Sequence, residues 1–460
     1  MMTLSKSAKD SGIGLYWDAV LNHKAAADKK EKCHVIEVDS NDRDKQISDR
    51  HEITAWLGFN FEGRGDKYSK QKYHWYHFGG TDYDAESGRN AIFQIQGEGK
   101  GWSESVDDEG GNADFLMFAD LDYSHPEVCE DVTNWGKWIV SEVGLRGFRL
   151  DAVQHFSQRF TKEWIEALRK EHGDLFYVGE FWTGNKQDLV DWVNQMDRKF
   201  SLYDSPLLNN FSNISKGEAA DLRKVFDDTL VQEMPVNAVV SVFFLLHDQQ
   251  NKYVDGYILT QTKQTVVVNH DTQPGQTVET PVEGFFKPLA YSLILLRRDG
   301  YPSVFYGDLY GMKGDNPEPP SCGDKLADLV LARKLYAYGE LNDYWNDANC
   351  IGWVRRGTHD RKDGCAVVMS NTGPGEIQMH VGPEHKGEVW TDILGWEQGE
   401  VTIDEEGNGV FKCPGCSVAV WVNKDAEGRE NFPVNFDSDI YKEAGKKNDD
   451  EEKKDEENKE

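Results

Sequence analysis

The stretch Gly147–His155, G-F-R-L-D-A-V-Q-H, begins as a short apolar strand and ends in polar residues. Side chains alternate between the two faces of a strand, so Arg149 and Asp151 project to one side and Phe148 and Leu150 to the other. A guanidinium beside a carboxylate favours the charged form of that carboxylate. An ionised Asp at the carboxyl end of a strand is what a covalent nucleophile toward a sugar requires. The alternative for an isolated R-x-D pattern is a structural ion pair, so the neighbouring segments decide between the two.

Length and charge narrow the class of protein. The 460 residues leave room for about three domains. The formal net charge of −30 argues against nucleic acid and against anionic membrane surfaces, because both are bound through basic patches. The same charge suits a neutral polyol ligand or bound cations. Fourteen Trp and eighteen Tyr supply enough aromatic rings to stack on sugars, although most aromatic side chains serve as core.

Three features indicate a soluble cytoplasmic protein. No run approaches the ~18–20 apolar residues of a membrane span. The first ten residues, M-M-T-L-S-K-S-A-K-D, contain no apolar signal region. Seven cysteines, an odd and scattered set, do not indicate a disulfide framework. The single C-x-x-C at Cys413–Cys416 predicts a turn rather than a zinc site, because no second pair accompanies it.

Strand and helix patterns alternate along much of the chain. We predict helices that end at Gly12 or cover 127–143, 161–172 and 189–200, and strands at 14–21, 147–151, 175–179, 201–204 and 301–306. Such alternation predicts a parallel sheet of the barrel type, with functional residues at the carboxyl ends of its strands.

Four predicted strand ends carry polar residues of the same kind. They are Asp18 with Asn22-His23, Arg149–His155, Glu180, and Asn269-His270-Asp271. Four carboxylates and three histidines at successive strand ends are expected to converge on one mouth. Two carboxylates about 5–5.5 Å apart are the requirement for retaining glycoside hydrolysis. Each element alone is a weak signal, but the ordered set indicates a sugar-cleaving site.

A family resemblance supports this interpretation. The motifs D-A-V-L-N-H (18–23), G-F-R-L-D-A-V-Q-H (147–155), V-G-E-F-W (178–182) and V-V-N-H-D (267–271) resemble, in order, the four conserved regions of the α-amylases of glycoside hydrolase family 13. Residues 47–84 and 115–126 resemble the calcium-rich inserted domain of the bacterial liquefying type. The absence of a signal region, with this sequence type, resembles the intracellular α-amylases of filamentous fungi.

The resemblance implies a fold and a function. The fold class is α/β: a TIM-type (β/α)8 barrel with a long β-rich domain inserted after its third strand and a C-terminal antiparallel β domain. The barrel is expected at 1–23 and 124–345, the inserted domain at 24–123 and the C-terminal domain at 346–424. A charged tail at 425–460 is expected to be disordered.

The implied site residues divide into catalytic and substrate-binding groups. Asp151 would be the nucleophile, Glu180 the general acid and base, and Asp271 would bind sugar hydroxyls and favour a distorted ring. Arg149 would orient and ionise Asp151. The remaining substrate-binding residues would be His23, Gln154, His155 and His270. Gln154 stands where many relatives carry Lys, which puts the preference at that position in doubt.

The resemblance also implies a calcium cofactor. Asn22, Asp114, Asp120 and the backbone carbonyl of His155 match the main calcium site of the family, and Asp122 is a candidate for a second ion. Hard oxygen ligands from several segments suit Ca²⁺, which takes six to eight oxygens. The alternative is that these are solvated acids on a highly acidic chain.

Two departures from the family set further expectations. The chain begins where the family would finish its second helix, so two strand–helix units, roughly 60 residues, are expected to be missing and the strands near Gly14 and Tyr301 to form open edges.

The second departure is an extra segment, Val240–Gln264, between the sixth helix and the seventh strand. Val-Ser can be encoded by GTNAGT and Gln by CAG, which are intron ends, so we predict an unspliced intron; a surface loop is the alternative. The chain as written is therefore expected to be inactive.

The expected function is retaining hydrolysis of α-1,4-glucosidic bonds in starch- or glycogen-like glucans. Two alternatives stay open. In a 4-α-glucanotransferase an acceptor sugar replaces water, and a non-catalytic glucan-binding or defective product would lack turnover. The expected partner is an α-glucan polysaccharide or oligosaccharide, with no nucleic acid and no membrane, and a monomer is the default.

Overall fold

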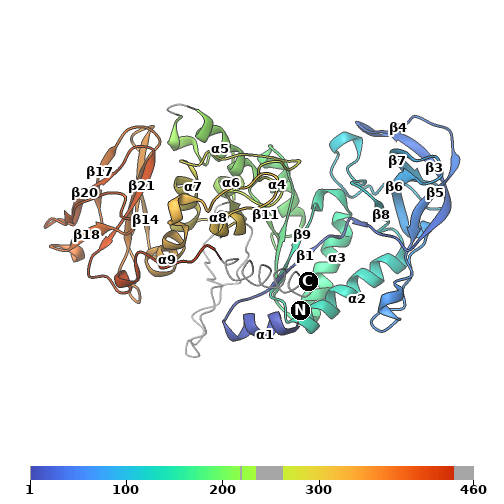
Figure 1. Ribbon diagram of the computed structural model, residues 1–460, viewed down its shortest axis with the longest axis horizontal. Helices are drawn as coiled ribbons and strands as arrows, with labels where there is room; N and C mark the ends of the chain where they lie inside the picture. Colours follow the sequence, from blue (N-terminus) through green and yellow to red (C-terminus); the bar gives the residue numbers. More distant parts are fainter. Residues whose placement is uncertain (1, 218–219, 235–262, 440–460) are drawn as a thin grey trace, which may run out of the picture. The chain divides into compact units, whose positions relative to one another are not determined.

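The computed structural model describes residues 2–217, 220–234 and 263–439 (Figure 1). The chain divides into two compact units, which are described one at a time. Among the described residues, the first consists of 2–182 and 191–203, and the second of 183–190, 204–217, 220–234 and 263–439. Within the described ranges, no helix is long and apolar enough to cross a membrane.

A parallel sheet forms the centre of the first unit. Its strands, in spatial order, are β1 (Tyr16–Ala19), β9 (Gly147–Leu150), β10 (Phe176–Gly179) and β11 (Ser201–Tyr203). All four residues of β9 are buried, as expected for the middle of a covered parallel sheet. Gly147 is required here because a Cβ at this position would stand 2.0 Å from the Phe176 carbonyl oxygen on the neighbouring strand.

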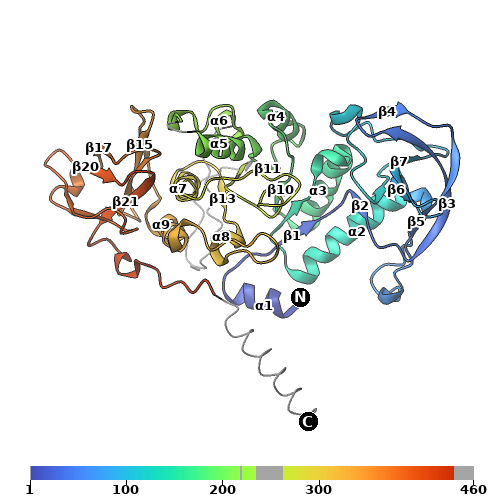
Figure 2. The same cartoon turned by 45° about the horizontal axis from the view of Figure 1, so that its top comes forward.

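Helices alternate with the strands in the sequence. They are α1 (Met2–Asp10), which precedes β1, then α2 (Pro126–Val143), α3 (Gln158–His172) and α4 (Lys186–Gln195), of which the part from Asp191 onward belongs to this unit. Pro126 occupies the first turn of α2, and Gly144 ends that helix with a left-handed φ of 72°. Figure 2 shows α3 beside α2, where Gly136 lets the buried ring of Trp164 approach closely.

The segment after β1 folds into an antiparallel sheet of seven strands. They are β2 (His23–Lys24), β3 (Lys29–Asp39), β4 (Asp42–Gln46), β5 (His51–Gly58), β6 (Phe78–Asp84), β7 (Arg89–Ile95) and β8 (Ala119–Leu121). The order is β2-β8-β6-β7-β3-β4, and β5 pairs with the other edge of β3. The short strands β2 and β8 join the start of the segment to its end through the register pair His23 and Asp120.

In the described part of the second unit, α-helices accompany a parallel strand pair and a β domain. The helices and the pair are α5 (Ser205–Lys216), α6 (Leu230–Glu233), β12 (Lys263–Val266), α7 (Lys287–Leu296), β13 (Tyr301–Ser303), α8 (Tyr306–Tyr310) and α9 (Leu326–Tyr336). All ten residues of α7 are buried, and this helix packs against α9 and against β21 of the β domain.

The β domain of the second unit is antiparallel. Its main sheet contains β14 (Leu341–Tyr344), β15 (Cys350–Arg355), β16 (Cys365–Ser370), β21 (Ser417–Asn423), β18 (Val389–Asp392) and β19 (Val401–Thr402), in that spatial order. A second sheet pairs β17 (Gly375–His380) with β20 (Asn408–Cys413). Between them lies a core that includes Met379, Trp390, Phe411 and Trp421.

Two predicted elements have different bounds. The helix expected at 189–200 is α4, which begins at Lys186 and ends at Gln195, because Asp197 and Arg198 adopt left-handed φ values of 54° and 56°. The strand expected at 301–306 ends at Ser303, because the chain turns into α8 through a bond from the Asp308 N–H to the Phe305 carbonyl.

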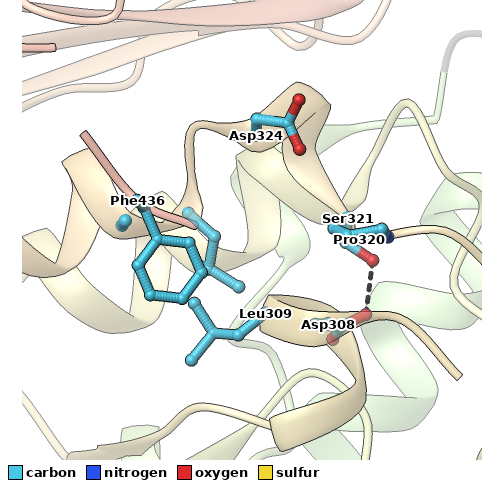
Figure 3. Close-up of a pocket in the computed structure, with 8 residues that line it drawn as sticks. Asp308, Leu309, Pro320, Ser321, Asp324 and Phe436 are labelled. Atoms are coloured by element: carbon cyan, nitrogen blue, oxygen red, sulfur yellow. Dashed lines mark hydrogen bonds between the residues drawn. The ribbon is translucent and has the colours of Figure 1, made fainter. Parts of the chain in front are cut away.

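The expected disorder from residue 425 onward is wrong for the first part of that segment. Phe432 is buried and stacks on Tyr336, and the Val434 N–H donates to Asp328 Oδ1 at 2.6 Å. Phe436 lies beside Leu309 (Figure 3). The two phenylalanines anchor this largely polar segment through apolar contacts. The prediction of disorder rested on the charged composition and did not take these two side chains into account. Residues 440–460 lie outside the described residues.

The predicted insert at 240–264 falls almost wholly outside the described residues. Its last two residues, Lys263 and Gln264, belong to β12, in which Gln264 pairs with Tyr301.

Candidate active site

Arg149 is the centre of the candidate site in the first unit. Its Nη1 atom lies 2.7 Å from Asp18 Oδ1 and 2.7 Å from Asp151 Oδ1, and its Nη2 atom lies 2.6 Å from Glu180 Oε2. Register explains the first contact, since Asp18 and Arg149 are directly paired on β1 and β9. The Arg149 side chain is only 10% exposed, and those of Glu180 and Asp151 are 5% and 21% exposed, so the ion pairs with these two carboxylates are largely shielded from water.

The two expected catalytic carboxylates follow directly after adjacent strands. The Asp151 N–H donates to the Ala19 carbonyl, and the Glu180 N–H donates to the Leu150 carbonyl, so the sheet bonding continues one residue past each strand. Ala152 then takes a left-handed φ of 45°, which turns the chain away from the sheet. The sequence pattern therefore placed Asp151 and Glu180 correctly at neighbouring strand ends.

Glu180 accepts hydrogen bonds on both carboxylate oxygens. Its Oε2 accepts from Arg149, and its Oε1 accepts from the indole Nε1 of Trp182 at 2.6 Å. The Trp182 ring in turn stacks on Tyr203, with ring centres 6.4 Å apart. Glu180 is buried, with 5% of its side chain exposed. Trp182 was not among the predicted site residues, although its place two residues after Glu180 in V-G-E-F-W is a usable signal.

The charges of the site support one another. Burial disfavours the charged guanidinium, but the carboxylates of Glu180 and Asp18 raise the pKa of Arg149 above its ordinary value. Arg149 therefore stays cationic and holds three carboxylates on one side of the sheet. Asp18, which was seen at a strand end but not assigned a role, is the most exposed of the three, at 57%.

His23 stands next to this cluster as a neutral hydrogen-bonding group. Its Nδ1 lies 3.0 Å from Asn22 Oδ1, which accepts, and its ring packs against Phe118. Burial lowers the pKa of His23, although the charges of Asp151 and Asp82 oppose the shift. A neutral imidazole close to Asp151 can hydrogen-bond a sugar hydroxyl without adding charge.

Gln154 and His155 lie in a single turn of 3₁₀ helix, η4 (Val153–His155). Both are buried. His155 Nδ1 donates to the Ala113 carbonyl at 2.5 Å, so its ring is turned toward the segment that precedes β8. Among the described residues, Gln154 Oε1 is buried and has no hydrogen-bond partner. A buried acceptor without a donor suggests a site that receives a donor from outside the chain.

The fourth predicted motif belongs to the second unit. Asn269 Oδ1 accepts from the N–H groups of Asp271 and Thr272 and so shapes the turn that follows β12. His270 Nε2 and Asp271 Oδ2 lie 3.0 Å apart and are both partly exposed, at 57% and 37%. The two side chains therefore form a solvent-accessible polar pair.

Buried oxygens converge on Asn22. Its amide Nδ2 donates to the Asp114 carbonyl at 3.0 Å, to Asp120 Oδ1 at 3.2 Å and to the His155 carbonyl at 2.7 Å. These three oxygens come from distant parts of the sequence and face one small volume. The other oxygen of Asp120, Oδ2, is buried and has no hydrogen-bond partner within the described part of the chain.

The acids around this point repel one another. Burial raises the pKa of Asp114 to about 7, and burial together with the charges of Asp114 and Asp122 raises the pKa of Asp120 well above its usual range. A set of only oxygen donors that is crowded, buried and short of positive charge fits a hard divalent cation such as Ca²⁺.

Asp122, the candidate for a second ion, already has a cation. Lys100 Nζ lies 2.5 Å from Asp122 Oδ2, and both side chains are more than 90% buried. The same ammonium donates to the carbonyls of Tyr76 and Phe78. A lysine tethered by three oxygens thus supplies the positive charge beside Asp122.

A further group near α2 has metal-ligating residue types that the sequence interpretation did not single out. His77, His125 and Glu127 place ligand atoms within 4.8 Å of one another. However, His77 Nδ1 accepts from the His74 N–H, so a neutral His77 carries its proton on Nε2 and donates it to Glu127 Oε2 at 3.0 Å. A protonated nitrogen does not bind a metal ion, so we interpret this group as a hydrogen-bonded cluster.

A buried arginine bridges two strand-end carboxylates on a parallel sheet, and a pair of carboxylates is the catalytic equipment of most glycoside hydrolases. The particular family follows from comparison: residues 1–351 match the family described as Alpha amylase, catalytic domain, and the chain belongs to it. It is 41% identical over 423 residues to the glucan 1,4-alpha-maltohexaosidase of Bacillus sp. (strain 707), covering 91% of this chain and 76% of that protein.

Two further comparisons agree. The chain is 38% identical to the cytoplasmic alpha-amylase of Escherichia coli (strain K12), over 90% of this chain and 81% of that protein. The crystal structure of an Anoxybacillus alpha-amylase superposes with a TM-score of 0.57 at 15% identity, covering 92% of this chain and 78% of that one, and shows the α-amylase fold. These relatives support the bacterial resemblance; the resemblance to filamentous fungal enzymes gains no support from them. The chain is thus a glycoside hydrolase of the α-amylase family.

Proposed function

We propose that the site around Arg149 hydrolyses α-1,4-glucosidic bonds by two displacements at the anomeric carbon. One observation carries the proposal: a single buried guanidinium holds Asp151 and Glu180 through two different nitrogens. Two carboxylates bridged in this way are close neighbours. The shared guanidinium supports the closer spacing of retaining enzymes over the wider spacing of inverting ones, which separate the two groups to leave room for a water.

In the first displacement, the Asp151 carboxylate attacks the anomeric carbon and Glu180 delivers a proton to the departing glycosidic oxygen. The bond from carbon to Asp151 forms as the bond to the leaving sugar breaks, which gives a β-glucosyl ester. Arg149 stabilises the ionised nucleophile. Glu180 takes up its proton when substrate displaces one of the two donors that now occupy its oxygens.

In the second displacement, Glu180 removes a proton from water as the water attacks the ester carbon and releases Asp151. Two inversions leave the product in the α configuration. Following the family motifs, His23, His270 and Asp271 bind the sugar in the cleavage subsite, and Gln154 and His155 serve the leaving-group side. For Gln154, the buried and unpartnered Oε1 supports a role as an acceptor for a sugar hydroxyl.

We further propose one calcium ion held by Asn22, Asp114, Asp120 and the His155 carbonyl. The convergence of three oxygens on the Asn22 amide supports it, and rotation about the Cβ–Cγ bond lets Asn22 offer its own oxygen. When bound, the ion would supply structural charge balance and no chemistry at the sugar. Since Lys100 already neutralises Asp122, the proposal contains no second ion.

Two broader expectations belong to the same proposal. The parallel strands of both units would be parts of an (β/α)8 barrel, which the α-amylase fold of the structural relative supports. A cytoplasmic location is supported by the similarity to the cytoplasmic alpha-amylase of Escherichia coli and by seven cysteines that are all free thiols.

Incubation of the protein with maltohexaose, followed by proton NMR of the anomeric signals, tests the reaction. The α-anomer is expected to appear first, before mutarotation produces the β-anomer. Initial release of the β-anomer would overturn the retaining mechanism. Products longer than maltohexaose would instead favour the glucanotransferase alternative, and no turnover would support the expectation that the chain as written is inactive.

A further inference from the structure

Two cysteines from separate sheets of the β domain meet beside a glycine. Cys350 begins β15 and Cys413 ends β20, where it pairs with Gly375 of β17. A Cβ built on Gly375 would stand 2.3 Å from Cys350 Sγ and 3.5 Å from Cys413 Sγ. The missing side chain of Gly375 is therefore the space into which both sulfur atoms project, and the two thiols share a hydrogen bond.

The local C-x-x-C motif does not pair with itself in this arrangement. Cys416, its second cysteine, is exposed and donates its S–H to the carbonyls of Asn371 and Thr372 at 3.5 Å and 3.3 Å. Cys416 is thus turned toward the 371–372 turn, while Cys413 is turned toward Cys350. The partner of Cys413 is set by the packing of two sheets and is more than sixty positions away in the sequence.

The two thiols differ in reactivity. Cys350 is half-buried, whereas Cys413 is 1% exposed. The hydrogen bond from Cys413 lowers the pKa of the Cys350 thiol, and the same bond raises the pKa of the Cys413 thiol. A small reagent therefore reaches Cys350 first, and finds there the better nucleophile.

We propose that Cys350 and Cys413 are a reversible oxidation site that forms a disulfide by exchange with low-molecular-weight disulfides of the glutathione type. The Cys350 thiolate attacks one sulfur of the reagent, forms a mixed disulfide and expels one thiolate. The Cys413 sulfur, after loss of its proton, attacks Cys350 Sγ, forms the protein disulfide and expels the second thiolate. Overall, two protein thiols are oxidised, one reagent disulfide is reduced to two thiols, and no other reactant is needed.

A disulfide between Cys350 and Cys413 would connect the two sheets of the β domain. It would join β15 of the main sheet to β20 of the two-stranded sheet and close a long loop of chain. Cys350 also adjoins a turn that contacts the start of η5 (Leu222–Lys224), because the Leu222 N–H donates to the Ala348 carbonyl at 2.7 Å. Closing a long loop restricts the unfolded chain, so the oxidised β domain is expected to melt at a higher temperature than the reduced one.

The test uses the full chain, incubated with glutathione disulfide under native conditions, then denatured and alkylated with N-ethylmaleimide. The reduced protein has seven cysteines to alkylate, and the expected oxidised form has two fewer. Peptide mapping without reductant should identify the link between Cys350 and Cys413. A melting curve with and without dithiothreitol should show the higher midpoint in the oxidised sample only.

Three variants sharpen the result. C416S should form the link at an unchanged rate, and C350S should not form it. G375A should form it at least about tenfold more slowly, because the added methyl group displaces Cys350 Sγ. A link between Cys413 and Cys416, a stable mixed glutathione adduct on Cys416 alone, or an unchanged rate in G375A would each overturn the proposal. If C350S does not fold, peptide mapping of the unsubstituted chain and C416S decides it.

Discussion

Nη2 of Arg149 lies 2.6 Å from Oε2 of Glu180, while Nη1 of the same guanidinium lies 2.7 Å from Asp151. The group that orients the nucleophile therefore also holds the acid and base. Both oxygens of Glu180 accept hydrogen bonds, an arrangement that favours the ionised carboxylate. Both donors disfavour protonation of Glu180, and substrate binding is the event that our proposal couples to the displacement of one of them.

Replacement of either catalytic carboxylate is expected to abolish turnover. Asp151→Asn removes the nucleophile and Glu180→Gln removes the acid and base, so each deletes a whole step. Initial rates on maltohexaose measure the effect. Asp174→Asn serves as control, because that carboxylate is 87% exposed and remote from the cluster. If either variant keeps more than about a tenth of the rate, the assignment fails.

Loss of Arg149 should destabilise the fold as well as the reaction. Arg149→Ala leaves the carboxylates of Asp151 and Glu180 without their shared cation in a shielded site, which is expected to cost about 3–5 kcal/mol of unfolding free energy. Urea unfolding measures it. Arg223→Ala is the matched control, since the Arg223–Asp221 pair is exposed on the surface and its loss should leave the midpoint unchanged. Equal midpoints for the two variants would contradict the role of Arg149.

Trp182→Phe should change the pH dependence of catalysis. The indole donates to Glu180 Oε1, and a donor to a carboxylate stabilises its ionised form. Without that donor, Glu180 keeps its proton to higher pH, so the alkaline limb of the kcat profile should move upward. The ring stays stacked on Tyr203, because Phe preserves most of the aromatic surface. A uniform fall in rate with an unmoved limb would show that Trp182 is only structural.

Calcium should change how stability depends on pH. In the metal-free protein, the pKa of Asp114 is raised to about 7 by burial, whereas an unfolded Asp titrates near about 3.9. Between these values the folded state binds more protons than the unfolded state, so stability falls as pH rises. With a chelator, the melting temperature should therefore fall from about pH 4 to pH 7, and excess calcium should remove this fall because the ion replaces the proton.

Asp120→Asn provides the corresponding variant for calcium. It keeps the shape of the side chain but removes a charge, so the calcium-dependent rise in melting temperature should shrink or vanish. Magnesium is the control ion, because it is smaller and gives up its water reluctantly. Titration should saturate at one calcium per chain, since Lys100 neutralises Asp122. A second equivalent of similar affinity, or no calcium response at all, would contradict the proposed site.

Local signals in the sequence determined much of this protein. The two-residue period of β9 put Arg149 and Asp151 on one side, and their direct contact confirms that part of the prediction. The helix expected at 127–143 is α2, because Pro126 and Gly144 mark its ends by backbone geometry alone. Such features depend on neighbouring residues, so the sequence is sufficient to predict them. The family itself followed from four short motifs in order.

Contacts between distant segments were decided only by the tertiary structure. Arg149 also binds Asp18 and Glu180 because the register of three parallel strands aligns them, and no single strand encodes that register. Lys100 contacts Asp122, and Cys413 lies beside Cys350 rather than Cys416, because separate segments of the chain pack together in the folded protein. Sequence periodicity determines the face of a strand on which a side chain lies. The partner of that side chain depends on how separate strands and sheets pack together. Their positions are set by hydrophobic burial across the whole domain.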